Sequence, residues 1–250
     1  MRILVANANT TEAITARCAD AARAAAGAGT EIVPGTPRFG PAVISSGLEN
    51  AIAAHGLLDL LAEHAGQVDA VVLAVSLDTA LQAARQLMPC PVVGMTEAAC
   101  LTACMLGNRF GLVTFGHTES YRQLIEGYGL SARLSGLVGV DFTPQRALSD
   151  PEGALHAVAE GLAGLVAGGA DSVVLGGAAL AGMEPSLRAA SPVPLLDGMI
   201  CGVRMAEALV ALAPQRPRSG PMAPVRGRES TGLSPALAAL LRGQGQGGEG

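Results

Sequence analysis

With 250 residues, of which 50% are hydrophobic and 2% aromatic, the chain is long enough for one or two domains with a large buried core. Its net charge of −5, without a basic patch interleaved with aromatic residues, argues against nucleic-acid binding. Five cysteines in a chain without a secretory signal argue against a disulfide framework, since an odd number cannot all be paired.

Short β-branched runs alternate with Ala/Leu-rich helical stretches along the first half of the chain. The predicted elements are a strand at 3–6, a helix at 11–26, a strand at 30–35, a helix at 48–66, a strand at 70–75, a helix at 79–88 and a strand at 91–95. The run at 70–75, AVVLAV, is continuously apolar, which is typical of a parallel strand covered on both faces.

The second half of the chain repeats this order. The predicted elements are a helix at 97–106, a strand at 109–114, a helix at 118–128, a strand at 136–142, a helix at 151–167, a strand at 172–176, a helix at 184–190, a strand at 193–197 and a helix at 199–212. Matching VVL and Pro-Val strands about one hundred residues apart indicate a duplicated pair of units, not a solenoid.

The sequence therefore predicts an α/β fold of two pseudo-symmetric, doubly wound (Rossmann-like) units with parallel sheets. Residues 1–98 plus 206–250 would form the first unit and its C-terminal tail, and residues 99–205 the second. Ligands of open α/β sheets bind beyond the carboxyl ends of the strands, so we expect an active-site cleft between the units.

From Pro214 the chain is rich in Pro, Arg, Gly and Ser, which predicts a surface tail with a short helix at 234–242 and a disordered end, GQGQGGEG. The chain enters its first predicted strand at Arg2 and has no apolar run of about twenty residues. We therefore expect a cytoplasmic protein that does not span a membrane.

Three segments carry a resemblance to a known family: DAVVLAVSLDTAL (69–81), PVVGMTEAACLTACMLG (91–107) and GADSVVLGGAALAG (169–182). They resemble the aspartate/glutamate/hydantoin racemase superfamily, in its hydantoin/allantoin racemase-like branch, and the resemblance extends over roughly residues 1–212. It implies a small-molecule substrate, no metal or organic cofactor, and a homo-oligomer.

Two positions depart from the family. Each of its two active-site junctions carries a cysteine, one thiolate removing a proton from the α-carbon and the other thiol supplying one to the opposite face. The resemblance places these positions at Val75 and Gly177, and neither residue can carry a proton. The sequence therefore predicts that the two-thiol mechanism is lost.

Three neighbouring residues are the candidates for acid–base catalysis: Ser76, Asp78 and His117. A serine needs its own base, whereas a carboxylate or an imidazole can move a proton directly. Two of them have a structural alternative, because Asp78 can cap the helix that follows and His117 can be a solvated or capping loop residue.

The resemblance also assigns a set of residues to substrate binding. In the opening segment MRILVANANTTEAIT, a polar turn between a strand and a helix can bind an anion. Ser45 or Ser46 is either a ligand contact or a helix N-cap. The full set is Asn7, Asn9, Thr10, Ser46, Val75, Thr79, Thr114, Gly176, Gly177 and Ala178.

Other polar residues are expected to be structural. Glu97 is predicted at a helix start, where the helix dipole favours a carboxylate. Cys100 and Cys104 are four residues apart, which is weak evidence for zinc without a nearby histidine. Asp197 and Cys201 belong to the family's closing helix.

Two functions remain open from the sequence. The first is a hydantoin-racemase-like enzyme that acts on a small carboxylate or cyclic amide, with isomerase or related proton-transfer or lyase chemistry that does not use two thiols. The alternative is a non-catalytic ligand-binding protein of the same fold. A conventional two-cysteine racemase would require Cys90 or Cys201 at a strand end, where neither is predicted.

Overall fold

A computed structural model describes residues 1–189 and 191–243. The chain divides into two compact units, each treated by itself below. Unit 1 comprises Met1–Gly94 and the chain from Val203 onward, and unit 2 comprises Met95–Gly202. The predicted disordered end lies, from residue 244 on, outside the described residues.

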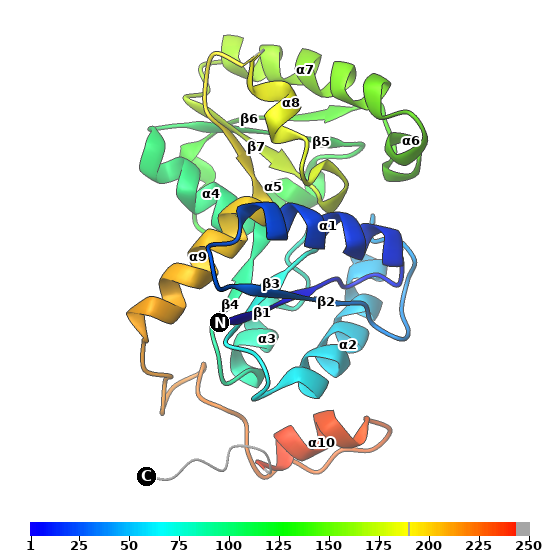
Figure 1. Ribbon diagram of the computed structural model, residues 1–250, viewed down its shortest axis with the longest axis vertical. Helices are drawn as coiled ribbons and strands as arrows, with labels where there is room; N and C mark the ends of the chain where they lie inside the picture. The colour runs from blue at the N-terminus through cyan, green and yellow to red at the C-terminus, as the bar shows by residue number, and fades with distance from the viewer. Residues whose placement is uncertain (190, 244–250) are drawn as a thin grey trace. The chain divides into compact units, whose positions relative to one another are not determined.

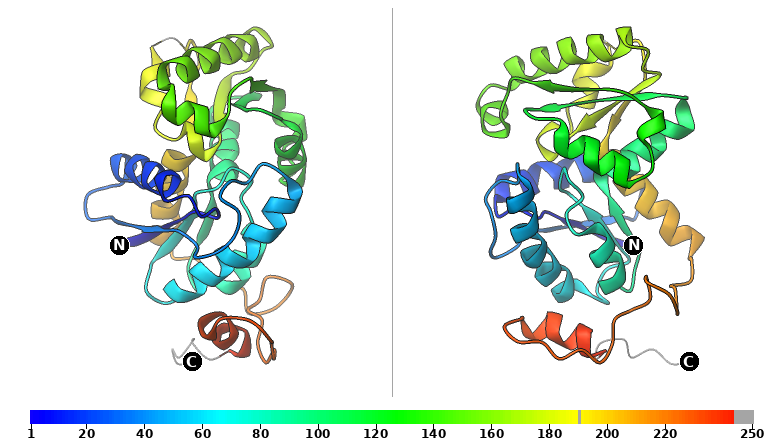
Figure 2. Two further views of the ribbon diagram at one scale, coloured as in Figure 1. Left: turned by 90° about the vertical axis from the view of Figure 1, so that its right-hand side faces the viewer. Right: turned by 180° about the vertical axis from the view of Figure 1, so that it is seen from behind.

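Unit 1 is built on a four-stranded parallel sheet with the strand order β2-β1-β3-β4. Helix α1 covers one face of this sheet, and α2 and α3 cover the other (Figures 1 and 2). The elements are β1 (Arg2–Ala6), α1 (Glu12–Ala25), β2 (Glu31–Gly35), α2 (Gly47–His64), β3 (Ala70–Leu73), α3 (Leu81–Leu87), β4 (Val92–Gly94) and, near the C-terminus, α10 (Pro235–Arg242).

Unit 2 has the same topology, with the strand order β6-β5-β7-β8 in a second parallel sheet. The elements are α4 (Met95–Leu106), β5 (Phe110–Phe115), α5 (Glu119–Gly127), η1 (Ser131–Arg133), β6 (Leu134–Val140), α6 (Pro144–Ser149), α7 (Pro151–Ala167), β7 (Ser172–Gly176), η2 (Ala178–Leu180), α8 (Glu184–Arg188), β8 (Leu195–Asp197) and α9 (Gly198–Leu212), which runs on into unit 1. The predicted α/β class with two doubly wound units is confirmed.

The boundaries differ from prediction where the backbone departs from helical geometry. The helix predicted from 79 begins at Leu81, because Asp78 and Ala80 have left-handed φ values of +45° and +54°. Helix α4 begins two residues early, directly after β4. Helix α6 was not predicted, although Thr143, whose Oγ1 accepts from Arg146 N, is an ordinary N-cap before a proline.

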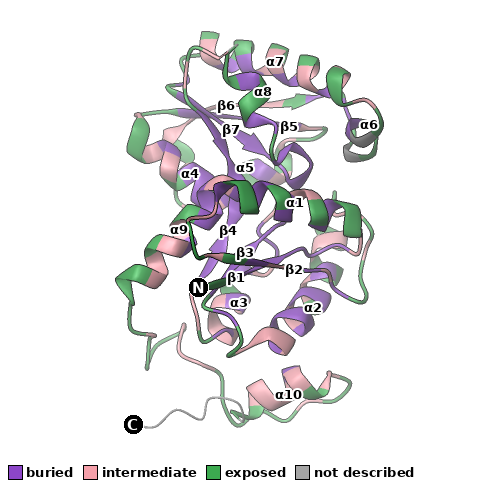
Figure 3. Ribbon diagram, in the orientation of Figure 1, coloured by how far each residue is buried: buried purple, intermediate pink, exposed green. Residues whose placement is uncertain are grey.

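One central strand of each sheet, β3 in unit 1 and β7 in unit 2, is completely buried, as the colouring in Figure 3 shows. In unit 2 the face of the sheet under α7 packs Val113, Val173 and Leu175 against Val158 and Leu162. Parallel strands buried on both faces leave little room for polar groups within the sheet. Chemistry is therefore confined to the loops at the strand ends.

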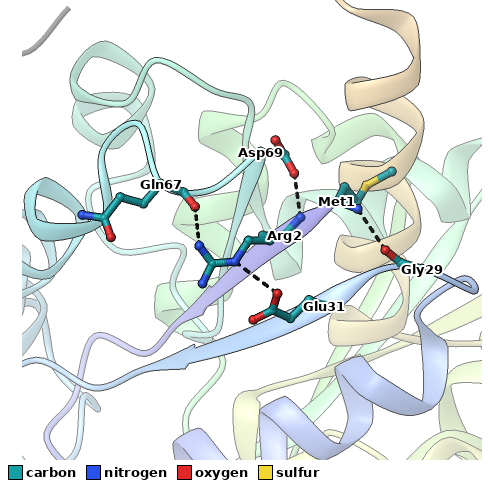
Figure 4. A network of polar contacts seen from close by, with 6 residues as sticks. All are labelled: Met1, Arg2, Gly29, Glu31, Gln67 and Asp69. Carbon is teal, nitrogen blue, oxygen red and sulfur yellow. Dashed lines mark hydrogen bonds and ion pairs between the residues drawn. The ribbon is translucent and has the colours of Figure 1, made fainter.

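A polar network fixes the amino edge of the unit 1 sheet (Figure 4). Arg2 N donates to Asp69 Oδ2 at 2.6 Å, while its guanidinium donates to Gln67 O at 2.8 Å and pairs with Glu31 at 3.2 Å. These bonds connect the start of β1 to the first residue of β2 and to the segment before β3. None of these bonds involves the opposite edge of the sheet, where the loops after the carboxyl ends of the strands lie.

The tail from Pro214 follows the surface of unit 1, and the predicted short helix is confirmed as α10. It packs against α2, with Leu237 buried. Within the described residues, no helix combines the length and apolar character needed to cross a membrane.

Candidate active site

The residues predicted for the site follow the strands at which the order of each sheet reverses. In unit 1 the carboxyl ends of β1 and β3 form such a topological switch point, with Ala6 paired to Leu73. In unit 2 β5 and β7 form the corresponding point, with Thr114 paired to Gly176. Open α/β sheets bind ligands at these points, so each unit gathers its candidate residues at a binding edge.

Two asparagines fix the loop after β1. Asn7 is fully buried, and its Nδ2 donates to Asn9 Oδ1 and to Thr15 Oγ1, both at 3.0 Å, while its Oδ1 accepts from Asn9 N at 3.0 Å. Asn9 Oδ1 also accepts from Thr11 N at 3.0 Å. No hydrogen bond within the described residues uses Asn9 Nδ2. The geometry therefore favours Asn7 as a support of the loop and Asn9 as the donor to a ligand.

The neighbouring polar residues hold the start of α2. Ser46 is its N-cap: its Oγ accepts from Glu49 N at 3.2 Å, and its backbone N donates to Glu49 Oε2 at 2.9 Å, which completes a capping box. Hydrogen bonds from the backbone and hydroxyl of Ser45, and from Ser46, hold the pKa of Glu49 below its ordinary value. The capping alternative for Ser46 is confirmed, and Thr10 N is bonded to Pro41 O at 3.0 Å.

The turn between β3 and α3, residues 75–80, contains Val75, the position to which the resemblance assigns the family's first cysteine. Val75 is 3% exposed, Ser76 is half-buried and Asp78 is 4% exposed. Asp78 N donates to Val75 O at 3.1 Å, and Leu81 N donates to Asp78 O at 3.0 Å. The N-cap of α3 is Ala80, not Asp78.

The Asp78 carboxylate packs against the backbone of Gly94, the last residue of β4. A Cβ at Gly94 would collide with both carboxylate oxygens. The next residue, Thr79, is 1% exposed and donates its hydroxyl to Asn50 Oδ1 at 2.6 Å. The acid–base groups of enzymes are often buried titratable side chains beside a ligand-binding site, and Asp78 has this placement.

At the binding edge of unit 2 the two candidate polar side chains differ in burial. Thr114, the site residue predicted in β5, is 3% exposed. His117 is exposed and makes no hydrogen bond with any described residue. His117 therefore lies in an exposed loop after β5, without a side-chain partner among the described residues that would orient it.

Gly177, the position to which the resemblance assigns the family's second cysteine, has a backbone conformation that only glycine adopts readily. Gly177 has φ +132° and ψ 140°, and its carbonyl accepts from Leu180 N at 2.9 Å. The following loop is held by Asp197, whose Oδ2 accepts from Gly182 N at 2.6 Å and whose Oδ1 accepts from Met199 N at 2.8 Å. Burial raises the pKa of Asp197, and its role is structural, as predicted.

We expect Gly177→Cys to lower the free energy of unfolding by about 1–3 kcal/mol, because any Cβ is strained at this φ. Gly177→Ala should cost about as much, since the strain comes from Cβ and not from sulfur. Urea unfolding of both variants measures this effect. A Gly177→Cys variant as stable as the parent protein would contradict it.

The cysteines that are present do not take the place of the missing thiols. Cys18 and Cys100 are completely buried, Cys90 precedes β4 at its amino end, and Cys201 is buried in the first turn of α9. Burial raises the pKa of Cys90 and of Cys201 to about 11, so both are thiols at neutral pH. Among residues 1–189 and 191–243, no group of three or more His, Cys, Asp or Glu could hold a metal ion.

Comparisons with known proteins agree with this arrangement. Residues 3–206 match the family model described as Asp/Glu/Hydantoin racemase. A hydantoin racemase from Pseudomonas sp. (strain NS671) is 34% identical, over 85% of this chain and 87% of the relative. The solved allantoin racemase of Klebsiella pneumoniae is 36% identical with a TM-score of 0.87, over 96% of this chain and 98% of that one. Allantoin racemase of Pseudomonas fluorescens is 31% identical with a TM-score of 0.88, over 93% of this chain and 100% of that one.

Proposed function

Because this chain belongs to the Asp/Glu/hydantoin racemase family, we propose that it transfers a proton at the α-carbon of a small hydantoin-like cyclic amide or carboxylate without using cysteine. Its relatives make it an enzyme of the racemase/isomerase superfamily. The proposal concerns the substrate class and the groups that move the proton.

One observation carries the proposal. The turn that would hold the first thiol keeps a buried carboxylate, Asp78, three residues after Val75, at the topological switch point of unit 1. A carboxylate can accept and return a proton, whereas the side chains of Val75 and Gly177 cannot. The proposal therefore gives Asp78 the acid–base role.

In the proposed reaction an Asp78 carboxylate oxygen accepts the α-proton. The electron pair of the broken C–H bond moves onto the adjacent carbonyl oxygen of the substrate and forms an enolate. Hydrogen-bond donors stabilise such an oxyanion, and the Asn9 Nδ2 group on the neighbouring loop is the donor proposed for it. Ser76, half-buried on the same turn, is proposed to contact the substrate.

The enolate then takes a proton back at the α-carbon. While the enolate persists, the proton on Asp78 exchanges with water. Return of the exchanged proton from Asp78 on the same face then gives exchange with solvent hydrogen and no inversion. Delivery of a proton from water to the opposite face gives racemisation, and the hydroxide left behind takes the proton from Asp78. Both routes replace the α-hydrogen by deuterium in D₂O. Exchange at this position is thus the readout that all versions of the mechanism share.

The test is incubation of the protein in D₂O with substituted hydantoins, allantoin and amino-acid-derived carboxylates, followed by proton NMR. We expect loss of the α-proton signal of at least one compound at a rate proportional to protein concentration. A sample without protein gives the spontaneous rate. No exchange above that rate for any compound would contradict the proposal.

The alternative is a ligand-binding protein of the same family without catalysis. It is favoured by one observation: at both thiol positions the side chain is apolar or absent. Saturable binding in calorimetry, together with no exchange in D₂O, would establish this alternative. We further propose, from the family resemblance, that the protein is a cytoplasmic homo-oligomer that uses no metal or organic cofactor.

A further inference from the structure

The turn that carries Ser76 and Asp78 has an unusual backbone. Only three non-glycine residues in the described part of the chain have a positive φ, and two of them, Asp78 at +45° and Ala80 at +54°, flank Thr79. Such conformations persist only where the surrounding structure holds them in place. The question is which contacts hold this turn.

Thr79 itself is held by one side chain from another element. Its hydroxyl donates to Asn50 Oδ1 at 2.6 Å, and this is the single hydrogen bond that Thr79 makes with the described residues. The two backbone bonds that close the turn involve Asp78 and Leu81 as donors and do not involve Thr79. The hydrogen bond to Asn50 therefore holds Thr79, the residue that lies between the two strained residues Asp78 and Ala80.

Asn50 is in turn rigidly placed. Its backbone N donates to Ser46 O at 3.0 Å within the first turn of α2, and the Ser46–Glu49 capping box fixes that turn. Thr79 is 1% exposed, so water cannot easily replace the Asn50 oxygen. The connection links a well-capped helix to the turn that carries the candidate acid–base group.

We propose that Asn50 is a positioning residue that acts through Thr79 to hold the 75–80 turn, and with it the Asp78 carboxylate, in the reactive geometry. This inference rests on the proposed function of Asp78. Sequence reasoning gave no role to Asn50 and assigned Thr79 to direct substrate binding. The hydrogen bond gives the pair a joint role in support of the turn.

The test compares Asn50→Ala, Thr79→Val and the double variant. Hydrogen exchange should become about 3- to 10-fold faster at the amides of Asp78 and Leu81, which is the range expected for one lost hydrogen bond. The kcat of α-proton exchange should fall about 10- to 100-fold, because a small misplacement of a reacting group has effects of this size, while KM changes little. The double variant should be no worse than either single variant, since both remove one bond.

Matched variants separate positioning from general stability. Thr30 Oγ1 donates to Glu207 Oε1 at 2.7 Å in the same unit, away from the carboxyl edge. Thr30→Val therefore removes an equivalent hydrogen bond. It should leave unchanged both the kcat of α-proton exchange and the rate of amide hydrogen exchange in the 75–80 turn. Asn50→Asp keeps the accepting oxygen and should restore most of kcat.

The inference would be overturned if the amides of the turn exchanged at the parent rate in Asn50→Ala. It would also be overturned if the effects of the two single variants added up in the double variant. A change in KM instead of kcat would also overturn it. If the parent protein catalyses no α-proton exchange, the proposed function fails separately. Amide exchange then still decides whether Asn50 holds the turn.

Discussion

Asp78→Asn is expected to slow α-proton exchange by about 10²–10⁴-fold, the usual contribution of a positioned acid–base group. Asparagine has nearly the shape of aspartate, but its amide cannot accept the α-proton. The carboxylate is buried against Gly94 at the end of β4, so no solvent buffer can readily replace it. Rates of deuterium incorporation in D₂O measure the effect, with KM expected to change only a few-fold.

Asp59→Asn is the matched control, because Asp59 is also a buried aspartate of unit 1 but lies within α2. It should leave the exchange rate unchanged. Full activity of Asp78→Asn would contradict the acid–base role of Asp78. The same measurement on Ser76→Ala and His117→Ala then decides between the other two candidates.

Gly94→Ala is expected to lower the free energy of unfolding by about 1–3 kcal/mol, since an added Cβ overlaps the Asp78 carboxylate in a packed site. The carboxylate must move to make room. The rate of α-proton exchange should therefore fall at least about tenfold in the fraction of the protein that remains folded. Urea unfolding and deuterium incorporation measure the two effects separately.

Gly47→Ala is the control for a glycine-to-alanine change in the same unit, because no described atom outside its chain neighbourhood lies within 4 Å of the added Cβ. It should change stability by less than about 0.5 kcal/mol and leave the rate unchanged. If Gly94→Ala behaved in the same way, the Asp78 carboxylate would not be fixed at the end of β4 in the manner described.

Much of the fold could be predicted from the sequence because the strands are continuous apolar runs. The segments AVVL in β3 and SVVLG in β7 are fully buried, and they stand out against the Ala-rich helices around them. The switch points follow from the strand order within each sheet, which the sequence analysis did not predict. Helix α6 was missed because it is only six residues long and shows no clear apolar period.

The site was less predictable because its geometry depends on backbone angles and on contacts distant in sequence. Nothing in the local sequence of SLDTAL shows that Asp78 and Ala80 are left-handed, or that Asn50, twenty-nine residues away, holds Thr79. The resemblance places a family cysteine at Gly177, and the sequence does not show that this residue has a φ of +132°, a conformation that glycine favours. Asn7 was predicted to contact the substrate, and its side chain bonds to Asn9 and Thr15, a support of the loop that the sequence did not show.

The central claim is proton transfer without cysteine, and a cysteine-free protein tests it most directly. The variant replaces Cys18, Cys90, Cys100, Cys104 and Cys201 by alanine, with circular dichroism to verify the fold. If the fivefold variant does not fold, Cys90→Ala and Cys201→Ala are measured singly. We expect a hydantoin-like substrate still to exchange its α-proton in D₂O at most of the parent rate. Exchange that disappears in a folded protein lacking these thiols would contradict it.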